Sequence, residues 1–182
     1  LLELAHMNPK VVGITPAMAS GCGMNLLAKE MPGRFYDVGI EEEHAVTFGS
    51  GLSAGGMIPV FAVYSTFLQR CADQLIHDGA LQRTKMIIAV DRAGFVGEDG
   101  ETHHGLLDVP FMCTIPDITI YSPCCFRSLE ADINNALYAD KNSVAIRYPR
   151  GAQRDNISKL TYPCIDYATY GNPEADTVIV TY

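Results

Sequence analysis

The sequence predicts an α/β fold, a mostly parallel six-stranded sheet with helices on both faces. Six short apolar runs alternate with segments whose apolar residues recur at helical spacing, and this alternation favours parallel strands joined by helices. Polar, glycine-containing segments also follow several of the apolar runs. Such segments are typical of the carboxyl ends of parallel strands, where α/β proteins bind ligands.

The expected strands are short and rich in Val, Ile, Phe and Tyr, which favour a pleated, buried surface. The first, Val11–Thr15, ends before Pro16, because proline cannot donate a backbone hydrogen bond to a sheet. The other five cover residues 35–38, 59–64, 85–90, 118–121 and 144–148.

Three segments between these strands have apolar residues three or four positions apart, which predicts amphipathic helices. The predicted helices, with their apolar stripes in parentheses, are Glu42–Ala54 (Ala45, Val46, Gly49, Leu52), residues 66–78 (Phe67, Cys71, Leu75) and residues 126–138 (Leu129, Ile133, Leu137). In the second helix, Arg70, Gln74 and His77 share another face.

The pattern changes after Gly151. We expect residues 1–151 to form one domain, residues 152–174 to be a polar, turn-rich linker, and residues 175–182 to be the first strand of a truncated C-terminal domain. The chain does not begin with Met, so we expect a fragment of a longer protein.

Composition and charge exclude several classes of protein. The 182 residues are 48% hydrophobic and 19% charged, a globular composition, and no apolar run approaches the roughly 20 residues that span a membrane. A net charge of −8 argues against a nucleic-acid partner. The six cysteines lack zinc-site spacing. We expect reduced thiols in a cytoplasmic protein, with Cys71 and Cys113 in the core, although the adjacent Cys124 and Cys125 leave a redox role open.

Residues 91–105 contain five charged side chains, two histidines and four glycines directly after an expected strand. Glycines permit sharp turns and close approach to a ligand. Within the loop we expect Arg92 to bind an anion, Asp99 to bind hydroxyl groups, and His103 to bind a hydroxyl or carry a proton. A metal site is the weaker reading, because consecutive histidines rarely point at one ion, and we expect no metal ligands.

Other polar groups have two readings each. Glu42, in the run Glu41–Glu42–Glu43 after Gly39, either complements a helix dipole or meets a ligand at the sheet edge. Tyr64 and Phe67 are either core residues or a wall for a flat heterocycle. Arg150 is either a phosphate clamp or a solvated loop residue. Residues 20–25 fail as a dinucleotide fingerprint, since Leu26 occupies the third glycine position.

These motifs together resemble the 1-deoxy-D-xylulose-5-phosphate synthase family, thiamine-diphosphate-dependent enzymes of the transketolase superfamily. The most specific stretches are Tyr64-Ser-Thr-Phe-Leu-Gln-Arg70 and Asp91-Arg-Ala-Gly94. The other segments that carry the resemblance are residues 15–18, 34–48, 77–78, 81–82, 95–105 and 147–151. The resemblance implies a pyrimidine-type thiamine-diphosphate-binding domain, the central domain of a three-domain enzyme.

The resemblance also implies roles for eight residues. Glu42 and His103 would be catalytic, with Glu42 bonded to N1′ of the aminopyrimidine and Phe67 stacked on that ring. The implied substrate-binding residues are Tyr64, Arg70, Arg92, Asp99, His103 and Arg150. One departure is visible, because many relatives have Ala and Gln where this chain has Glu41 and Glu43.

The implied reaction joins pyruvate to glyceraldehyde 3-phosphate with loss of CO₂, in the synthesis of isoprenoid, thiamine and pyridoxal precursors. Mg²⁺ would bind only through the missing N-terminal domain, and the full-length enzyme would be a homodimer. We expect the fragment alone to be inactive. Two alternatives stay open, the C-terminal half of a split transketolase and a non-catalytic assembly module.

Overall fold

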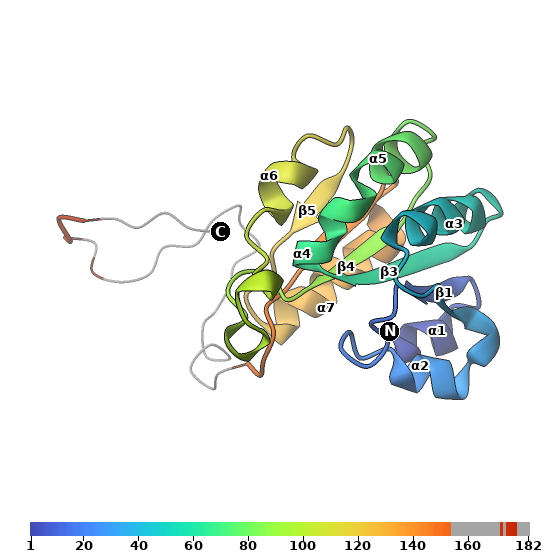
Figure 1. Cartoon of the computed structure of the whole chain (residues 1–182), viewed down its shortest axis with the longest axis horizontal. Coiled ribbons are helices and arrows are strands. Elements are labelled where there is room, and N and C mark those ends of the chain that lie inside the picture. Colours follow the sequence, from blue (N-terminus) through green and yellow to red (C-terminus); the bar gives the residue numbers. More distant parts are fainter. Residues whose placement is uncertain (154–171, 173, 178–182) are drawn as a thin grey trace. The chain divides into compact units, whose positions relative to one another are not determined.

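The computed structural model describes residues 1–153, 172 and 174–177 (Figure 1). Six strands form one sheet in the order β2-β1-β3-β4-β6-β5, and every pairing is parallel. The strands are β1 (Val11–Thr15), β2 (Phe35–Asp37), β3 (Ile58–Tyr64), β4 (Ile87–Asp91), β5 (Thr119–Tyr121) and β6 (Val144–Arg147). The predicted α/β class and parallel six-stranded sheet are therefore confirmed.

The helices are α1 (Leu2–Met7), α2 (Asn25–Glu30), α3 (Glu42–Ala54), α4 (Ser65–Leu68), α5 (Ala72–Gln74), α6 (Asp108–Met112) and α7 (Phe126–Asn134). Short 3₁₀ turns cover Pro32–Arg34, Gln69–Cys71, Gly97–Asp99 and Glu101–His103, and π-helical segments cover Leu75–Ala80 and Asn135–Ala139. Helix α3 has the predicted bounds, and α7 with its π-helical continuation covers the third predicted helix.

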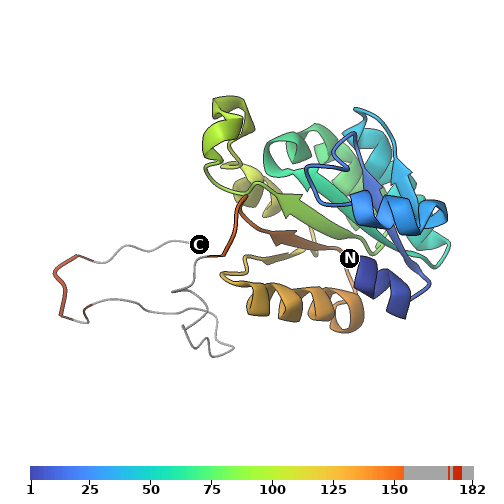
Figure 2. The same ribbon diagram turned by 90° about the horizontal axis from the view of Figure 1, so that it is seen from below.

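Helices cover both faces of the sheet, as predicted. One core cluster joins the sheet to α3 and the α4–α5 segment through Val46, Leu68 and Leu75. A second cluster joins the opposite face to α1, α2 and the segment after α7, through residues such as Leu27 and Leu137. Figure 2 shows α7, in orange, on the opposite side of the sheet from the green α4–α5 segment. Burial of apolar side chains on both faces stabilises this three-layer arrangement.

The prediction of one continuous helix over residues 66–78 is wrong. The segment consists of α4, a 3₁₀ turn, α5 and a π-helical stretch. Leu68, rather than Phe67, is buried with Cys71 and Leu75. Apolar residues at both 67 and 68 left the phase of the stripe ambiguous, and the steps of three and four residues between Leu68, Cys71 and Leu75 are also those of a regular α-helix, so the spacing did not reveal the interruption.

The prediction of two core thiols is right for one cysteine only. Cys71 is buried, and its thiol donates to the carbonyl oxygen of Leu68 at 3.1 Å. Cys113 is exposed, so its placement in the core was wrong. Its apolar neighbour Met112 ends the short helix α6 and takes the buried position, which leaves Cys113 just beyond the helix on the surface.

Iodoacetamide at pH 8 is expected to label Cys113 and Cys124 well before Cys22 and Cys71. Alkylation requires the thiolate. Burial, and next the negative charge of Asp91, raises the pKa of Cys22 to about 12, and burial raises the pKa of Cys71 above its ordinary value. Peptide mapping by mass spectrometry measures each rate. Equal labelling of Cys22 and Cys113 in the native protein, rather than only in urea, would contradict this expectation.

Contacts between residues divide the chain into two units, Leu1–Gly151 and Ala152–Tyr182. The linker expected at residues 152–174 and the strand expected at 175–182 lie largely outside the described residues and stay predictions. Across the described part of the chain, no helix combines the length and the apolar character needed to cross a membrane.

Candidate functional site

The carboxyl ends of the parallel strands lie at one edge of the sheet, and the polar segments begin there. Tyr64, the last residue of β3, pairs in register with Asp91, the last residue of β4. Val90 pairs in the same way with Arg147 of β6. The loop after β1, helix α4 and the loop after β4 therefore start side by side, at the edge where open α/β sheets bind ligands.

Glu42 is a buried carboxylate at this edge. A glycine turn at Gly39 (φ 76°) leads from β2 into α3, and Asp37 holds the turn by accepting a hydrogen bond from the Gly39 N–H at 3.1 Å. Glu42 begins α3 with its side chain 1% exposed, whereas Glu41 and Glu43 are exposed. A side chain that only complements the helix dipole has no need to be buried. Because Glu42 is buried and its two neighbours are not, the ligand-binding reading is favoured for Glu42 and not for Glu41 or Glu43.

Arg70 lies beside Glu42 and over the ring of Phe67. Nη1 of Arg70 donates to Oε1 of Glu42 at 3.0 Å, and Cζ of Arg70 lies 4.6 Å from the centroid of the Phe67 ring. The ring centroid of Phe67 is 6.0 Å from that of Tyr64 and 5.3 Å from that of His103. Tyr64 and Phe67 are half-buried rather than enclosed in the core, so they form an aromatic wall at the sheet edge.

Arg92 is fixed by four groups. Its backbone has a φ of 61°, a left-handed conformation that non-glycine residues rarely adopt and that is common at functional sites. Cζ of Arg92 lies 3.7 Å from the centroid of the Tyr64 ring. Its guanidinium donates from Nε to Asp99 at 2.8 Å and from Nη1 to the Gly21 carbonyl oxygen at 3.1 Å, and Nη1 lies 3.3 Å from Asp91.

Asp99 bridges two guanidinium groups. Its Oδ2 accepts from Arg92, and its Oδ1 lies 3.1 Å from Nη1 of Arg150. The hydrogen bond from Arg92, followed by the positive charge of Arg150, lowers the pKa of Asp99. Burial raises the pKa of Asp91, although the adjacent charge of Arg92 opposes that shift. Asp99 therefore links Arg92 and Arg150 through its two carboxylate oxygens.

The two adjacent histidines differ in their surroundings. His103 lies against the rings of Phe67 and Tyr64, and its Nδ1 is 2.9 Å from the Thr102 hydroxyl oxygen. His104 instead accepts a hydrogen bond from the Val96 N–H through its Nδ1 atom at 3.2 Å, which is a structural role in the loop. No group of three or more His, Cys, Asp or Glu residues in the described ranges is arranged to hold a metal ion.

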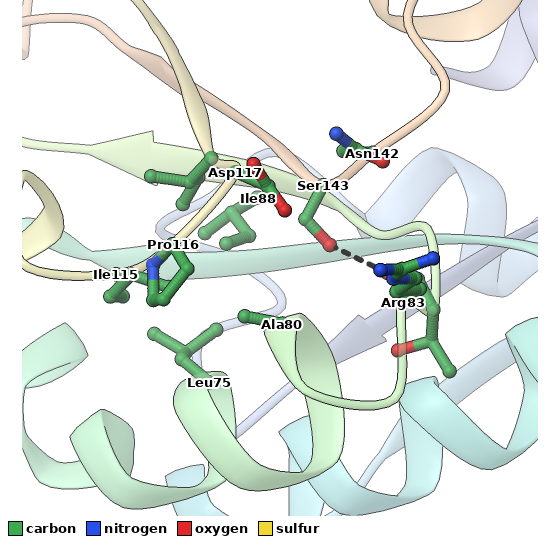
Figure 3. A pocket seen from close by; sticks show the side chains of 11 residues that line it. Leu75, Ala80, Arg83, Ile88, Ile115, Pro116, Asp117, Asn142 and Ser143 are labelled. Carbon is green, nitrogen blue, oxygen red and sulfur yellow. Dashed lines mark hydrogen bonds between the residues drawn. The ribbon is translucent and has the colours of Figure 1, made fainter.

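The structure brings the eight predicted site residues into one connected cluster, in which Glu42 is buried and the other seven border the surface to different extents. Contacts run from Glu42 through Arg70, Phe67 and Tyr64 to Arg92, and on to the remaining members Asp99, His103 and Arg150. Three hollows on the described surface include none of the eight. The hollow in Figure 3 lies among Ile88, Ile115 and Ser143, away from this cluster, and has room for a few water molecules at most.

Sequence reasoning missed two residues that shape the site, Gly21 and Asp91. A Cβ atom on Gly21 would collide with the hydroxyl of Tyr64, so only glycine allows this backbone to approach Tyr64 and accept from Arg92. The glycines of residues 20–25 were a signal of such an approach, even though the segment fails as a dinucleotide fingerprint. Asp91 is a charged residue ending an apolar strand, which was a second available signal.

Comparison with known proteins identifies the class. Residues 1–155 match the model of the transketolase pyrimidine-binding domain, and the chain belongs to this family. It is 53% identical over 152 residues to the 1-deoxy-D-xylulose-5-phosphate synthase of Chlorobaculum tepidum, covering 84% of this chain and 24% of that protein. It is 49% identical over 151 residues to the synthase of Bacteroides thetaiotaomicron, covering 83% and 23%. The chain thus spans about a quarter of the length of these relatives.

Solved structures show the same fold at lower identity. A split-gene transketolase described as an inactive beta4 tetramer has a TM-score of 0.73 and 24% identity, over 92% of this chain and 53% of that chain. The transketolase of Campylobacter jejuni has a TM-score of 0.71 and 19% identity, over 79% and 23%. These likenesses define the fold of the domain, whereas the identity of about 50% with the synthases bears on its function.

Proposed function

We propose that this chain is the pyrimidine-binding part of a 1-deoxy-D-xylulose-5-phosphate synthase, which condenses pyruvate with glyceraldehyde 3-phosphate and releases CO₂. The observation that carries the proposal is the 53% identity with a curated synthase over 84% of the chain. The connected cluster of eight residues at the carboxyl edge of the sheet supports it, because each residue type there suits one part of the reaction.

Glu42 and Phe67 fit the aminopyrimidine of thiamine diphosphate. A carboxylate held away from water at the start of a helix can exchange a proton with a ring nitrogen, and the Phe67 ring offers a flat face for stacking. Thiamine diphosphate, when bound, supplies the carbon nucleophile and the electron sink for decarboxylation. Its diphosphate and a Mg²⁺ ion would be held by an N-terminal domain outside this chain.

The arginine cluster fits the phosphate of glyceraldehyde 3-phosphate. Arg92 and Arg150 are planar donors that suit phosphate oxygens, and Asp99 holds both of them in place. The ring of Tyr64 stacks against the Arg92 guanidinium and helps to fix its position. His103, which contacts both aromatic rings, is placed to move a proton to or from the substrate oxygen beside the Phe67 face.

We further propose that the full-length enzyme is a cytoplasmic homodimer with an N-terminal and a C-terminal domain beyond this chain. A split transketolase is the less favoured reading, because the solved split-gene transketolase is 24% identical whereas the synthase relatives are about 50% identical. The buried Glu42 carboxylate and its cationic partner also weigh against a purely structural assembly module, which has no use for them.

The test is release of labelled CO₂ from carboxyl-labelled pyruvate by the full-length protein. We expect release that requires thiamine diphosphate and matches, mole for mole, the product formed from glyceraldehyde 3-phosphate. The 182-residue chain alone is expected to give no turnover and to bind thiamine diphosphate very weakly. Transfer of a two-carbon unit from a ketose phosphate without CO₂ release would instead establish a transketolase.

A further inference from the structure

Arg70 makes the two contacts that the proposed function assigns to the aminopyrimidine ring. We propose that the Arg70 guanidinium is an internal stand-in for that ring: it holds the pyrimidine position until thiamine diphosphate displaces it, and the freed guanidinium then binds the phosphate of the acceptor substrate. This inference rests on the proposed function and adds to it an order of events and a coupling between the two ligands.

The geometry of Arg70 carries the argument. Its Nη1 donates to the Glu42 carboxylate at 3.0 Å, and its Cζ lies 4.6 Å from the centroid of the Phe67 ring. A guanidinium is flat and cationic, with N–H donors around its edge. It therefore occupies the position of a pyrimidine that stacks on Phe67 and shares a hydrogen bond with Glu42, although the guanidinium donates where a neutral ring nitrogen would accept. Two flat groups cannot lie in the same place, so the ring and the guanidinium compete.

The exposure of the two side chains shows that Arg70, and not Glu42, is the partner that can move out of the ion pair. The side chain of Glu42 is 1% exposed, whereas that of Arg70 is 46% exposed. A buried, ionised carboxylate without a hydrogen-bonding partner is costly, so Glu42 needs a partner whether the guanidinium or the ring lies beside it. Arg70 carries its guanidinium on a flexible stem at the surface and can turn outward at little cost in packing.

The backbone at Arg70 also suits a movable residue. Arg70 lies in the 3₁₀ turn Gln69–Cys71, between α4 and α5, and the π-helical stretch Leu75–Ala80 follows. Such interruptions of a helix often mark hinges and functional sites. The sequence predicted a regular helix over this segment, so the interruption is a property of the folded site.

The aromatic wall leads from Arg70 to the other arginines. Phe67, on which Arg70 lies, is 6.0 Å from Tyr64 between ring centroids, and Arg92 lies over the Tyr64 ring. A guanidinium released from Glu42 would turn along this wall in the direction of Arg92. Cofactor binding would then strengthen phosphate binding, and by linkage the phosphate would strengthen cofactor binding by the same factor.

The experiment replaces Arg70 in the full-length protein with methionine, which keeps the unbranched stem and removes the guanidinium. Titration calorimetry with thiamine diphosphate at saturating Mg²⁺ is expected to show affinity about tenfold tighter than for the parent protein. Loss of one half-exposed ion pair and one cation–π contact corresponds to roughly that factor. Arg70→Lys, which can pair with Glu42 but cannot stack as a plane, is expected to fall between the two.

Steady-state kinetics supply the second half of the test. Arg70→Met is expected to raise KM for glyceraldehyde 3-phosphate about tenfold while leaving KM for unphosphorylated glyceraldehyde unchanged. Arg127→Met is the matched control, because Arg127 is an exposed arginine on α7, on the opposite face of the sheet. It should change neither the cofactor affinity nor either KM.

An unchanged or weakened cofactor affinity in both Arg70→Met and Arg70→Lys would overturn the stand-in role and leave Arg70 a support for Glu42. If the parent protein binds thiamine diphosphate and releases CO₂ from pyruvate, that result overturns this inference alone. A parent protein that does neither overturns the proposed function together with the inference.

Discussion

Glu42→Gln in the full-length protein is expected to lower kcat for CO₂ release by about 10²- to 10⁴-fold, the usual contribution of a group that transfers a proton in catalysis. Glutamine has nearly the same shape, and in the protein without cofactor its side-chain oxygen can accept from Arg70 as the Glu42 carboxylate does at 3.0 Å. What the variant loses is the ability to give and take a proton. The measurement is steady-state release of labelled CO₂ at saturating thiamine diphosphate.

Glu43→Gln is the matched control for this expectation. Glu43 lies in the same first turn of α3 and carries the same charge, but its side chain is exposed. Its loss removes a helix-dipole contribution of about 0.3–1 kcal/mol and is expected to leave kcat within about twofold. If the two variants had the same kcat, the effect would be one of general charge at the helix start, and Glu42 would have no role as a proton carrier.

The strands could be predicted from the sequence because burial of both faces leaves a continuous apolar signal. All five residues of β1 are buried, and the predicted bounds of that strand agree with the structure. Helix α3 was equally clear, since its buried Ala45, Val46 and Gly49 keep helical spacing. The prediction for the α4–α5 segment failed because two adjacent apolar residues leave the helical pattern ambiguous. The spacing of apolar residues then cannot show whether the backbone hydrogen bonds close over three, four or five residues.

The sequence predicted which residues make up the site, but not which of them pair with one another. Charged residues after strands predicted which side chains gather, because parallel strands place their carboxyl ends together. Spacing could not show that Asp99 lies between Arg92 and Arg150, or that Arg70 turns to Glu42 rather than toward these arginines. Those pairings depend on loop geometry, including the left-handed backbone of Arg92, which the sequence does not express.

Arg147→Met is expected to destabilise the domain by about 3–5 kcal/mol, the usual cost of breaking a buried ion pair from one side. Arg147 ends β6, and its Nε and Nη2 donate to the two oxygens of Asp108 at 2.8 and 3.3 Å. The Asp108 side chain is 0% exposed at the start of α6. Without the guanidinium, that carboxylate keeps its place in the interior but loses the cation that offsets its desolvation.

Urea unfolding of the 182-residue chain measures this cost, with Arg127→Met as an exposed-arginine control expected to lie within about 0.5 kcal/mol of the parent. The double variant Arg147→Met with Asp108→Leu is expected to recover most of the loss, since an apolar pair of similar volume often replaces a buried ion pair without cost. Full recovery would show that the loss of stability in Arg147→Met comes from the unpaired Asp108 carboxylate. A double variant as unstable as Arg147→Met would place the penalty in lost packing or in the other contacts of Arg147, such as the Ser122 hydroxyl at 3.2 Å.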